Sequence, residues 1–141
     1  IPNLLIGQAY NASVTMGTDG NQFSAIWVDF NHNYIFEAAE YFSSNANAGA
    51  NGTAIITITP PLGSMVGPTR MRVRGGDDVQ MTAGQGCAAT NSGWGETEDY
   101  VVNILAPGPS DPAVTSIIAP PSGCIDSNQF LSVGVCNFLL F

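Results

Sequence analysis

Short runs of apolar and β-branched residues, each ended by Gly, Pro, Asn or Asp, recur along almost the whole chain. The clearest is Thr53–Thr59, which Pro60 and Pro61 end because proline cannot donate to a β-ladder. Helix signals are nearly absent, and only Phe36–Phe42 suits a short turn of helix. This pattern predicts an all-β fold, an immunoglobulin-like or jelly-roll-type sandwich of two sheets.

A proline-rich segment, residues 106–112, predicts a linker, with three prolines in seven residues. Residues 1–105 then form the main sandwich, and residues 113–141 form a strand-forming extension. About thirty residues cannot bury a sandwich core alone, so the extension must pack on the main domain, pair with another copy or begin a further domain. The predicted strands are Leu4–Gly7, Ala12–Met16, Phe23–Phe30, Thr53–Thr59, Thr69–Arg74, Tyr100–Leu105, Ala113–Ala119 and Phe130–Phe138.

The charge of the chain is low and acidic: 11 acids, three basic residues and no lysine give a formal net charge of −8 over 141 residues. Charged residues make up 10% of the chain, against about 25% in an average soluble domain. This composition predicts a secreted or cell-surface bacterial protein. It argues against nucleic acid and anionic membranes as partners, because phosphate binding needs clustered Lys and Arg. No apolar run reaches the roughly 20 residues of a membrane span, so no membrane insertion is expected.

The three cysteines allow one predicted disulfide, between Cys124 and Cys136, across an 11-residue interval. The alternative is three separate buried thiols, since cysteine is common in cores. Cys87 is left over and predicts a partner elsewhere or a free buried thiol. Its loop contains no basic neighbour that would lower its pKa.

All three basic residues of the chain, Arg70, Arg72 and Arg74, fall on one face of the strand Thr69–Arg74, because side chains alternate along a strand. Met71 points the other way, as does Val73. The face is either solvated or receives carboxylates, because the arginine fork matches a carboxylate bidentately.

The acid cluster of Glu96, Glu98 and Asp99 offers these carboxylates. We expect Glu96 and Glu98 to pair with Arg70 and Arg72. Alternation places Asp99 on the opposite face, where it would cap backbone or bind a metal.

A second set of oxygens follows the segment Trp27–Val28 and has the spacing of an EF-hand calcium loop. Its predicted calcium ligands are Asp29, Asn31, Asn33, the carbonyl of Ile35, Glu37, Glu40 and, from the acid cluster, Asp99. A true EF-hand is excluded because the loop follows a strand, and because Tyr34 stands where glycine is needed and resists positive φ. The alternative to calcium is an Asx-rich turn whose side chains cap the backbone.

Catalysis is not expected, and we assign no catalytic residue. His32 is the only histidine and sits in an Asn-rich turn. Glu37 and Glu40 are too close along a short turn to straddle a substrate. Trp27 lies mid-strand and is expected in the core, whereas Trp94 and Tyr34 are loop aromatics that either bind a glycan together or cover the end of the sandwich.

Three ordered motifs, Trp27–Asn31, Thr69–Val73 and Gly95–Val102, resemble the GEVED domain, which is named for its Gly-Glu-Val-Glu-Asp signature. The resemblance covers about residues 4–105. It implies a β-sandwich module of large secreted or surface proteins of Bacteroidetes-type bacteria, in a family not known for catalysis. The chain departs from the family where Asn33-Tyr34 replaces the usual Asp-Gly. The resemblance also implies one or more N-terminal strands before this region, which we expect to be missing here. The extension resembles the start of an immunoglobulin-like adhesion repeat.

These observations predict a non-catalytic structural or adhesive module whose partners are other copies of the chain or flanking domains. The missing strand, the extension and the apolar ends predict a filament subunit, in which the extension of one copy completes the sandwich of the next. The alternative is a carbohydrate-binding or spacer module of a secreted hydrolase. Calcium is the only cofactor expected.

Overall fold

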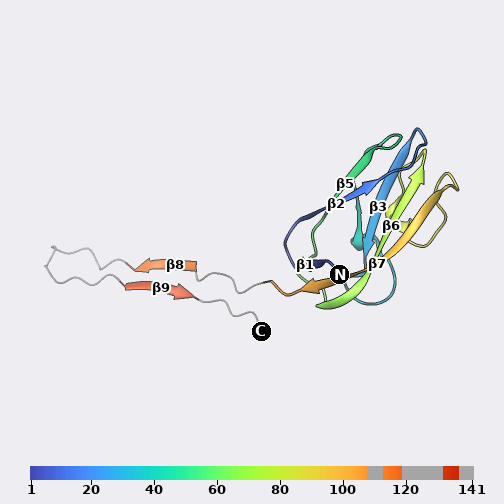
Figure 1. The fold of residues 1–141 in the computed structure, drawn as a ribbon. Coiled ribbons are helices and arrows are strands. Elements are labelled where there is room, and N and C mark those ends of the chain that lie inside the picture. The colour runs from blue at the N-terminus through green and yellow to red at the C-terminus, as the bar shows by residue number, and fades with distance from the viewer. Residues whose placement is uncertain (108–112, 119–131, 137–141) are drawn as a thin grey trace. The chain divides into compact units, whose positions relative to one another are not determined.

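The structure, a computed structural model, describes residues 1–107, 113–118 and 132–136 (Figure 1). These residues form strands and two short 3-10 helices, neither of which is long and apolar enough to cross a bilayer. The all-β fold predicted from the sequence is confirmed. The elements are β1 (Asn3–Leu5), β2 (Tyr10–Thr15), β3 (Gln22–Val28), η1 (Ala38–Glu40), β4 (Tyr41–Ser43), β5 (Thr53–Ile58), β6 (Gly67–Asp77), η2 (Ala83–Gln85), β7 (Gly95–Leu105), β8 (Ala113–Ile118) and β9 (Ser132–Cys136).

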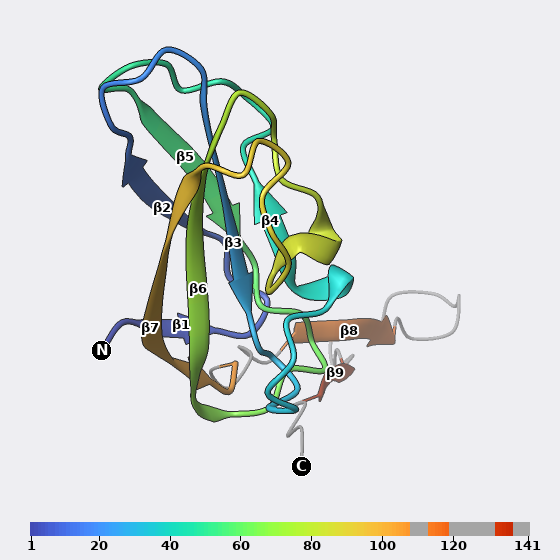
Figure 2. The ribbon, with the colours of Figure 1, turned by 90° about the vertical axis from the view of Figure 1, so that its right-hand side faces the viewer.

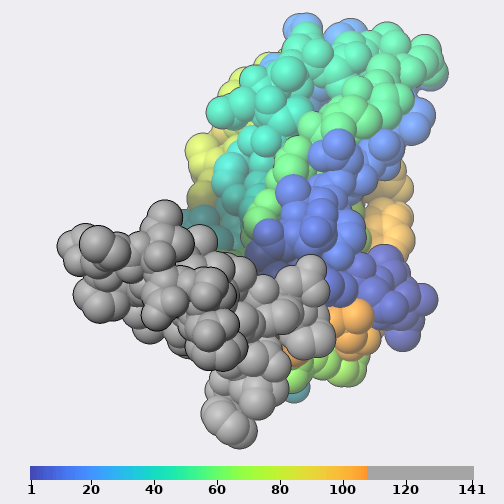
Figure 3. Space-filling view, turned by 90° about the vertical axis from the view of Figure 1, so that its left-hand side faces the viewer, coloured from blue at the N-terminus to red at the C-terminus, as the bar shows by residue number. Residues whose placement is uncertain are grey.

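Two sheets of unequal size make up the first part of the chain (Figure 2). The larger has the order β1-β7-β6-β3-β4, in which β1 runs parallel to β7 and all other neighbours are antiparallel. The smaller is the antiparallel pair β2-β5. Figure 3 shows the N-terminal segment, in blue, beside residues of the β5 region, in green, on one face of the molecule.

The strands β8 and β9 form an antiparallel pair of their own. The chain divides into two compact units, residues 1–106 and 107–141, and the predicted linker spans this division. Cys124 lies outside the described residues, so the predicted Cys124–Cys136 disulfide does too.

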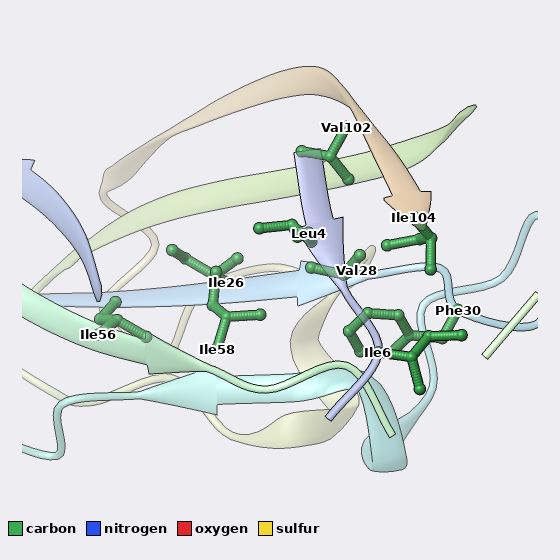
Figure 4. Packing of buried hydrophobic residues seen from close by; sticks show 9 residues of the cluster. All are labelled: Leu4, Ile6, Ile26, Val28, Phe30, Ile56, Ile58, Val102 and Ile104. Atoms are coloured by element: carbon green, nitrogen blue, oxygen red, sulfur yellow. The ribbon is translucent and has the colours of Figure 1, made fainter. Parts of the chain in front are cut away.

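An apolar core lies between the larger sheet and β2-β5 (Figure 4). The alternation along β5 shows how the sequence builds it: Ala54, Ile56 and Ile58 are buried, whereas the residues between them are exposed. Each large aliphatic side chain buried in this way contributes about 1.5–3 kcal/mol. The core consists of Leu4, Ile6, Ile26, Val28, Phe30, Ile56, Ile58, Val102 and Ile104.

A second, smaller core covers the outer face of the larger sheet, so β3 is buried on both sides. Trp27 is fully buried there against Ala25 and Met81, which confirms its predicted core position. The indole of Trp27 donates to the carbonyl of Ala83 at 3.0 Å, and the hydroxyl of Tyr41 donates to that of Met81 at 2.6 Å. These bonds hold the segment around η2 against the sheet, next to η1 (Figure 2).

Two predicted elements differ from the observed ones. The segment Phe36–Phe42, predicted as one helical turn, contains η1 and then enters β4, because Tyr41 and Phe42 pair with β3. The acid cluster does not precede a strand. It lies inside β7, which is 11 residues long and begins at Gly95.

Candidate functional site

The arginines of β6 form one face of the larger sheet, as predicted; we call this the arginine face (Arg70, Arg72 and Arg74). Met71 and Val73 alternate with them and pack against the core between the sheets. On the arginine face every guanidinium bonds to a neighbouring segment. The face therefore fastens loops to the sheet.

A two-pronged ion pair on the arginine face joins Arg72 to Asp99. Arg72 Nε donates to Asp99 Oδ1 at 2.7 Å, and Arg72 Nη2 donates to Asp99 Oδ2 at 2.7 Å. These hydrogen bonds lower the pKa of Asp99 and raise that of Arg72. The expectation that Asp99 caps backbone or binds a metal is therefore wrong: the antiparallel register sets Asp99 directly opposite Arg72, on the same face.

The predicted ion pairs of Glu96 and Glu98 with Arg70 and Arg72 are also wrong, for the same reason. Glu98 stands opposite Val73, so both glutamates project from the inner face of the sheet, away from the arginines. Both are exposed, and within the described part of the chain neither forms a salt bridge. A shift of one residue in register would have exchanged the two sets of acids.

The other two arginines bond to main-chain carbonyls. Arg70 donates to the carbonyl of Tyr34 at 2.8 Å, and its guanidinium lies 5.0 Å from the centre of the Tyr34 ring. Arg74 donates to the carbonyls of Gln85 and Ala88, the latter at 2.7 Å. Loss of hydration, followed by repulsion from Arg72, lowers the pKa of Arg74.

The Cys87 thiol lies beside this face and is exposed, contrary to the expectation of a buried thiol. Arg72 Nη1 is 3.4 Å from Cys87 Sγ. The sequence shows no basic neighbour because the contact comes from a strand that precedes Cys87 by 15 residues.

The loop after β3, residues 29–40, is closed by carboxylates that accept main-chain amides. Asp29 is 1% exposed; its Oδ1 accepts the amide of Asn33 at 3.1 Å, and its Oδ2 accepts that of Tyr34 at 3.0 Å. Asn31 and Asn33 each accept an amide two residues further on, as in Asx turns. The side chain of Thr69 donates to the carbonyl of Asp29, which ties the loop to β6.

Glu40 closes the other end of the loop. It is 3% exposed, and it accepts the amide of Phe30 at 2.7 Å and that of Glu37 at 3.1 Å. Burial raises the pKa of Glu40, although the amide hydrogen bonds act in the opposite direction. Glu37 is exposed and accepts the side-chain amide of Asn31 at 2.8 Å.

The backbone of this loop adopts the conformation that the sequence argued against. Tyr34 has a φ of +67° and His32 a φ of +54°. Tyr34 is held there by its amide bond to Asp29 and by Arg70, so contacts outweigh the usual preference against positive φ. His32 is half-buried, and its Nε2 has no hydrogen-bond partner among the described residues.

The predicted calcium ligands are only partly brought together. Asp29, Asn31, Asn33, Glu37 and Glu40 belong to one loop, but Asp99 is held by Arg72. Across the residues that the structure describes, no group of three or more His, Cys, Asp or Glu side chains is arranged to hold a metal. The observed hydrogen bonds are those of the structural alternative, the Asx-rich turn.

An open groove of about 610 Å³ lies between β2 and the inner face of β6 and β7. Met71 and Val73 supply apolar surface within it, above the buried Ile26. Glu96 and Glu98 line the same groove from β7. The β2-β5 sheet is too narrow to cover the larger sheet, and this leaves the groove open.

Two strand edges without partners among the described residues border this groove. Apart from β6, β7 pairs only with β1, and only at Asn103–Leu105. β2 pairs only with β5. The amide of Met16 donates to Gly52, the next pair in the β2-β5 register, so the main-chain groups of Asn11, Ser13 and Thr15 face away from β5.

The two aromatics predicted to bind glycan are not brought together. Both are exposed, Tyr34 at 76% and Trp94 at 75%. Tyr34 lies beside Arg70, whereas Trp94 lies just before β7 and lines the open groove. Arg70 marks the position of Tyr34 on β6, and Gly76 marks that of Trp94, because Gly76 pairs with the first residue of β7. The two positions are six residues apart along β6, about 20 Å.

The motif Gly95–Tyr100 begins at a residue that only glycine can occupy. Gly95 has a φ of +148°, and a Cβ there would lie 2.2 Å from the carbonyl oxygen of Gly75 on β6. This close approach starts the pairing that aligns Asp99 with Arg72. The motif residues are thus explained by strand pairing.

Comparisons with known proteins identify one family. The model of the GEVED domain family matches residues 23–103, which is more than half of the chain and contains β4 to β6 and all of β3 except its first residue. No curated protein matches, and no solved structure does. The matched range contains the Asp29 loop, the arginine face and the acid cluster, and the chain belongs to the GEVED domain family.

Proposed function

We propose that this chain is a non-catalytic structural module of a secreted or cell-surface protein, and that neighbouring copies join by strand exchange into a filament. One observation carries the proposal: the smaller sheet has two strands against five in the larger, and an open groove lies where further cover is needed. An unpaired strand edge beside an apolar groove is a site for an added strand.

The chemistry of the described residues supports a structural role. The buried carboxylates of Asp29 and Glu40 bond to main-chain amides, and the carboxylate of Asp99 bonds to Arg72. The family is one of small modules not known for catalysis. The low charge and the absence of lysine support an extracellular location.

The test is the assembly state of the full chain. We expect molar mass measured by light scattering to rise with protein concentration, and negative-stain electron microscopy to show filaments. A single monomeric species over the whole concentration range would overturn strand exchange between copies.

A carbohydrate-binding role is the second candidate, and it rests on the exposure of Trp94 at the open groove. Sugar rings stack on exposed aromatic faces, so a glycan array should then show binding that Trp94→Ala abolishes. Tyr34→Ala is the matched control, because it removes an equally exposed aromatic away from the groove. Binding that both variants retain would exclude this role for Trp94.

A further inference from the structure

We propose that the free edge of β2 is the acceptor in this assembly, and that β9 of a second copy is the donor. The inference rests on the proposed function and names the site and the partner strand. It follows from a comparison of the two free edges at the open groove, from the lining of the groove, and from the character of β9.

The free edges of β7 and β2 at the groove differ in how well they are protected against pairing with an added strand. Over Glu96–Asp99, β7 carries three acids, and charged side chains along an edge discourage pairing. β2 carries no charged residue and no proline between Tyr10 and Thr15. Its outward main-chain groups, at Asn11, Ser13 and Thr15, are therefore available to hydrogen-bond an added strand, as in β-strand addition.

A strand beside β2 would continue the smaller sheet over the groove. Every second side chain of such a strand would point toward Met71 and Val73, because side chains alternate. These positions favour apolar side chains of moderate size. The opposite positions would face solvent, as Ser13 and Thr15 of β2 do.

The sequence of β9 has this alternation: Val133 and Val135 alternate with Ser132, Gly134 and Cys136, which are smaller. Its pairing with β8 leaves its second edge without a partner among the described residues, so it can add to β2 without breaking its pairing with β8. β8 is the poorer donor, because its register is irregular between Val114 and Ser116 and a bulge bends a strand.

The charge of the groove also suits β9 as the donor. β9 contains no charged residue, so it adds no acid to a groove already lined by Glu96 and Glu98. A donor rich in Asp or Glu would be repelled there. A partner strand with Lys or Arg would suit these glutamates as well, and the test must separate it from a second copy.

The test uses the full chain and two pairs of variants. Ser13→Pro removes an outward amide of β2 while leaving the β2-β5 ladder intact, and Ser13→Ala is its matched control. Val133→Asp places a charge on the side chain that would enter the groove. Its control, Ser132→Asp, adds the same charge at the neighbouring position, which faces the other way. Near-ultraviolet circular dichroism checks that each variant keeps its fold.

We expect the wild type, Ser13→Ala and Ser132→Asp to associate alike, and Ser13→Pro and Val133→Asp to lose association at least tenfold. If the wild type associates but folded Ser13→Pro and Val133→Asp associate equally well, this choice of edge and donor is wrong while strand exchange stands. If the wild type stays monomeric, strand exchange itself fails. Monomeric wild type that binds an immobilised Lys-containing alternating peptide through β2 would replace the second copy with a basic partner strand.

Discussion

The loop after β3 and the arginine face both hold carboxylates, but in different ways. In the loop, Asp29 and Glu40 are almost fully buried and bond to main-chain amides, and among the described residues neither forms a salt bridge. On the arginine face, Asp99 is half exposed and bonds to a guanidinium. Burial decides how much each contact matters, because an amide left without a partner in the interior costs far more than a lost ion pair at the surface.

The buried carboxylate of Asp29 should give the largest effect on stability. We expect Asp29→Ala to lower the free energy of unfolding by about 2–4 kcal/mol, because two amides lose their acceptor in a buried site. Chemical denaturation measures it. Asn31→Ala is the control in the same loop and should cost less than about 1 kcal/mol, since Asn31 is exposed. Equal losses for the two variants would contradict the view that burial sets the weight of each contact.

The arginine face should give an intermediate effect. Arg72→Ala removes the fork on Asp99, a bond to the carbonyl of Gly86 at 2.9 Å and the contact with the Phe36 ring, and we expect a loss of about 1–2 kcal/mol. In a double-mutant cycle with Asp99→Asn, the coupling should be about 0.5–1 kcal/mol and should fall with salt. Glu98→Gln is the control and should show no coupling to Arg72. A salt-independent coupling would mean that the pair is more deeply shielded than its exposure indicates.

The pH dependence should have opposite signs in the two regions. The folded pKa of Asp99 is lowered, so its stabilisation is present above its unfolded pKa and is lost as pH falls through the folded value. The folded pKa of Glu40 is raised, so its stabilisation is present below its unfolded pKa and is lost as pH rises through the folded value.

Unfolding curves between about pH 2 and pH 7 measure both contributions. The stability difference between wild type and Asp99→Asn should shrink toward acid pH, by less than about 1 kcal/mol because Asp99 is half exposed. For Glu40→Gln, the stability of the wild type relative to the variant should increase toward acid pH. If the stability differences of the two variants changed with pH in the same direction, the predicted opposite pH dependence of the two regions would be wrong.

Calcium should give the smallest effect. Because main-chain amides already occupy Asp29 and Glu40, we expect added Ca²⁺ or a chelator to shift the melting temperature by less than about 1 °C. Thermal unfolding monitored by circular dichroism measures it. A saturable rise that disappears in Glu37→Ala, whose carboxylate is exposed, would establish the calcium alternative and make the loop the ion-dependent region.

Side-chain alternation and the boundaries of the apolar runs account for most of the structural features that the sequence predicted correctly. Alternation placed the three arginines on one face, whereas the mid-strand position of Trp27 predicted its place in a core and the ends of the apolar runs located most strands. It could not choose the partners of the acid cluster, because that depends on the register of two strands: Gly95 and Gly75 set it by close approach. The left-handed Tyr34 and the neighbour of Cys87 were missed because both depend on arginines distant in sequence.

The two tryptophans give this module separate optical reporters. Trp27 is sealed in the second core and should emit at short wavelength, resistant to acrylamide, until the sheet unfolds. Trp94 stands in solvent at the open groove and should emit at longer wavelength and be quenched readily. Anything that enters the groove changes the second signal and leaves the first unchanged, so occupancy and unfolding can be followed in one sample without a label.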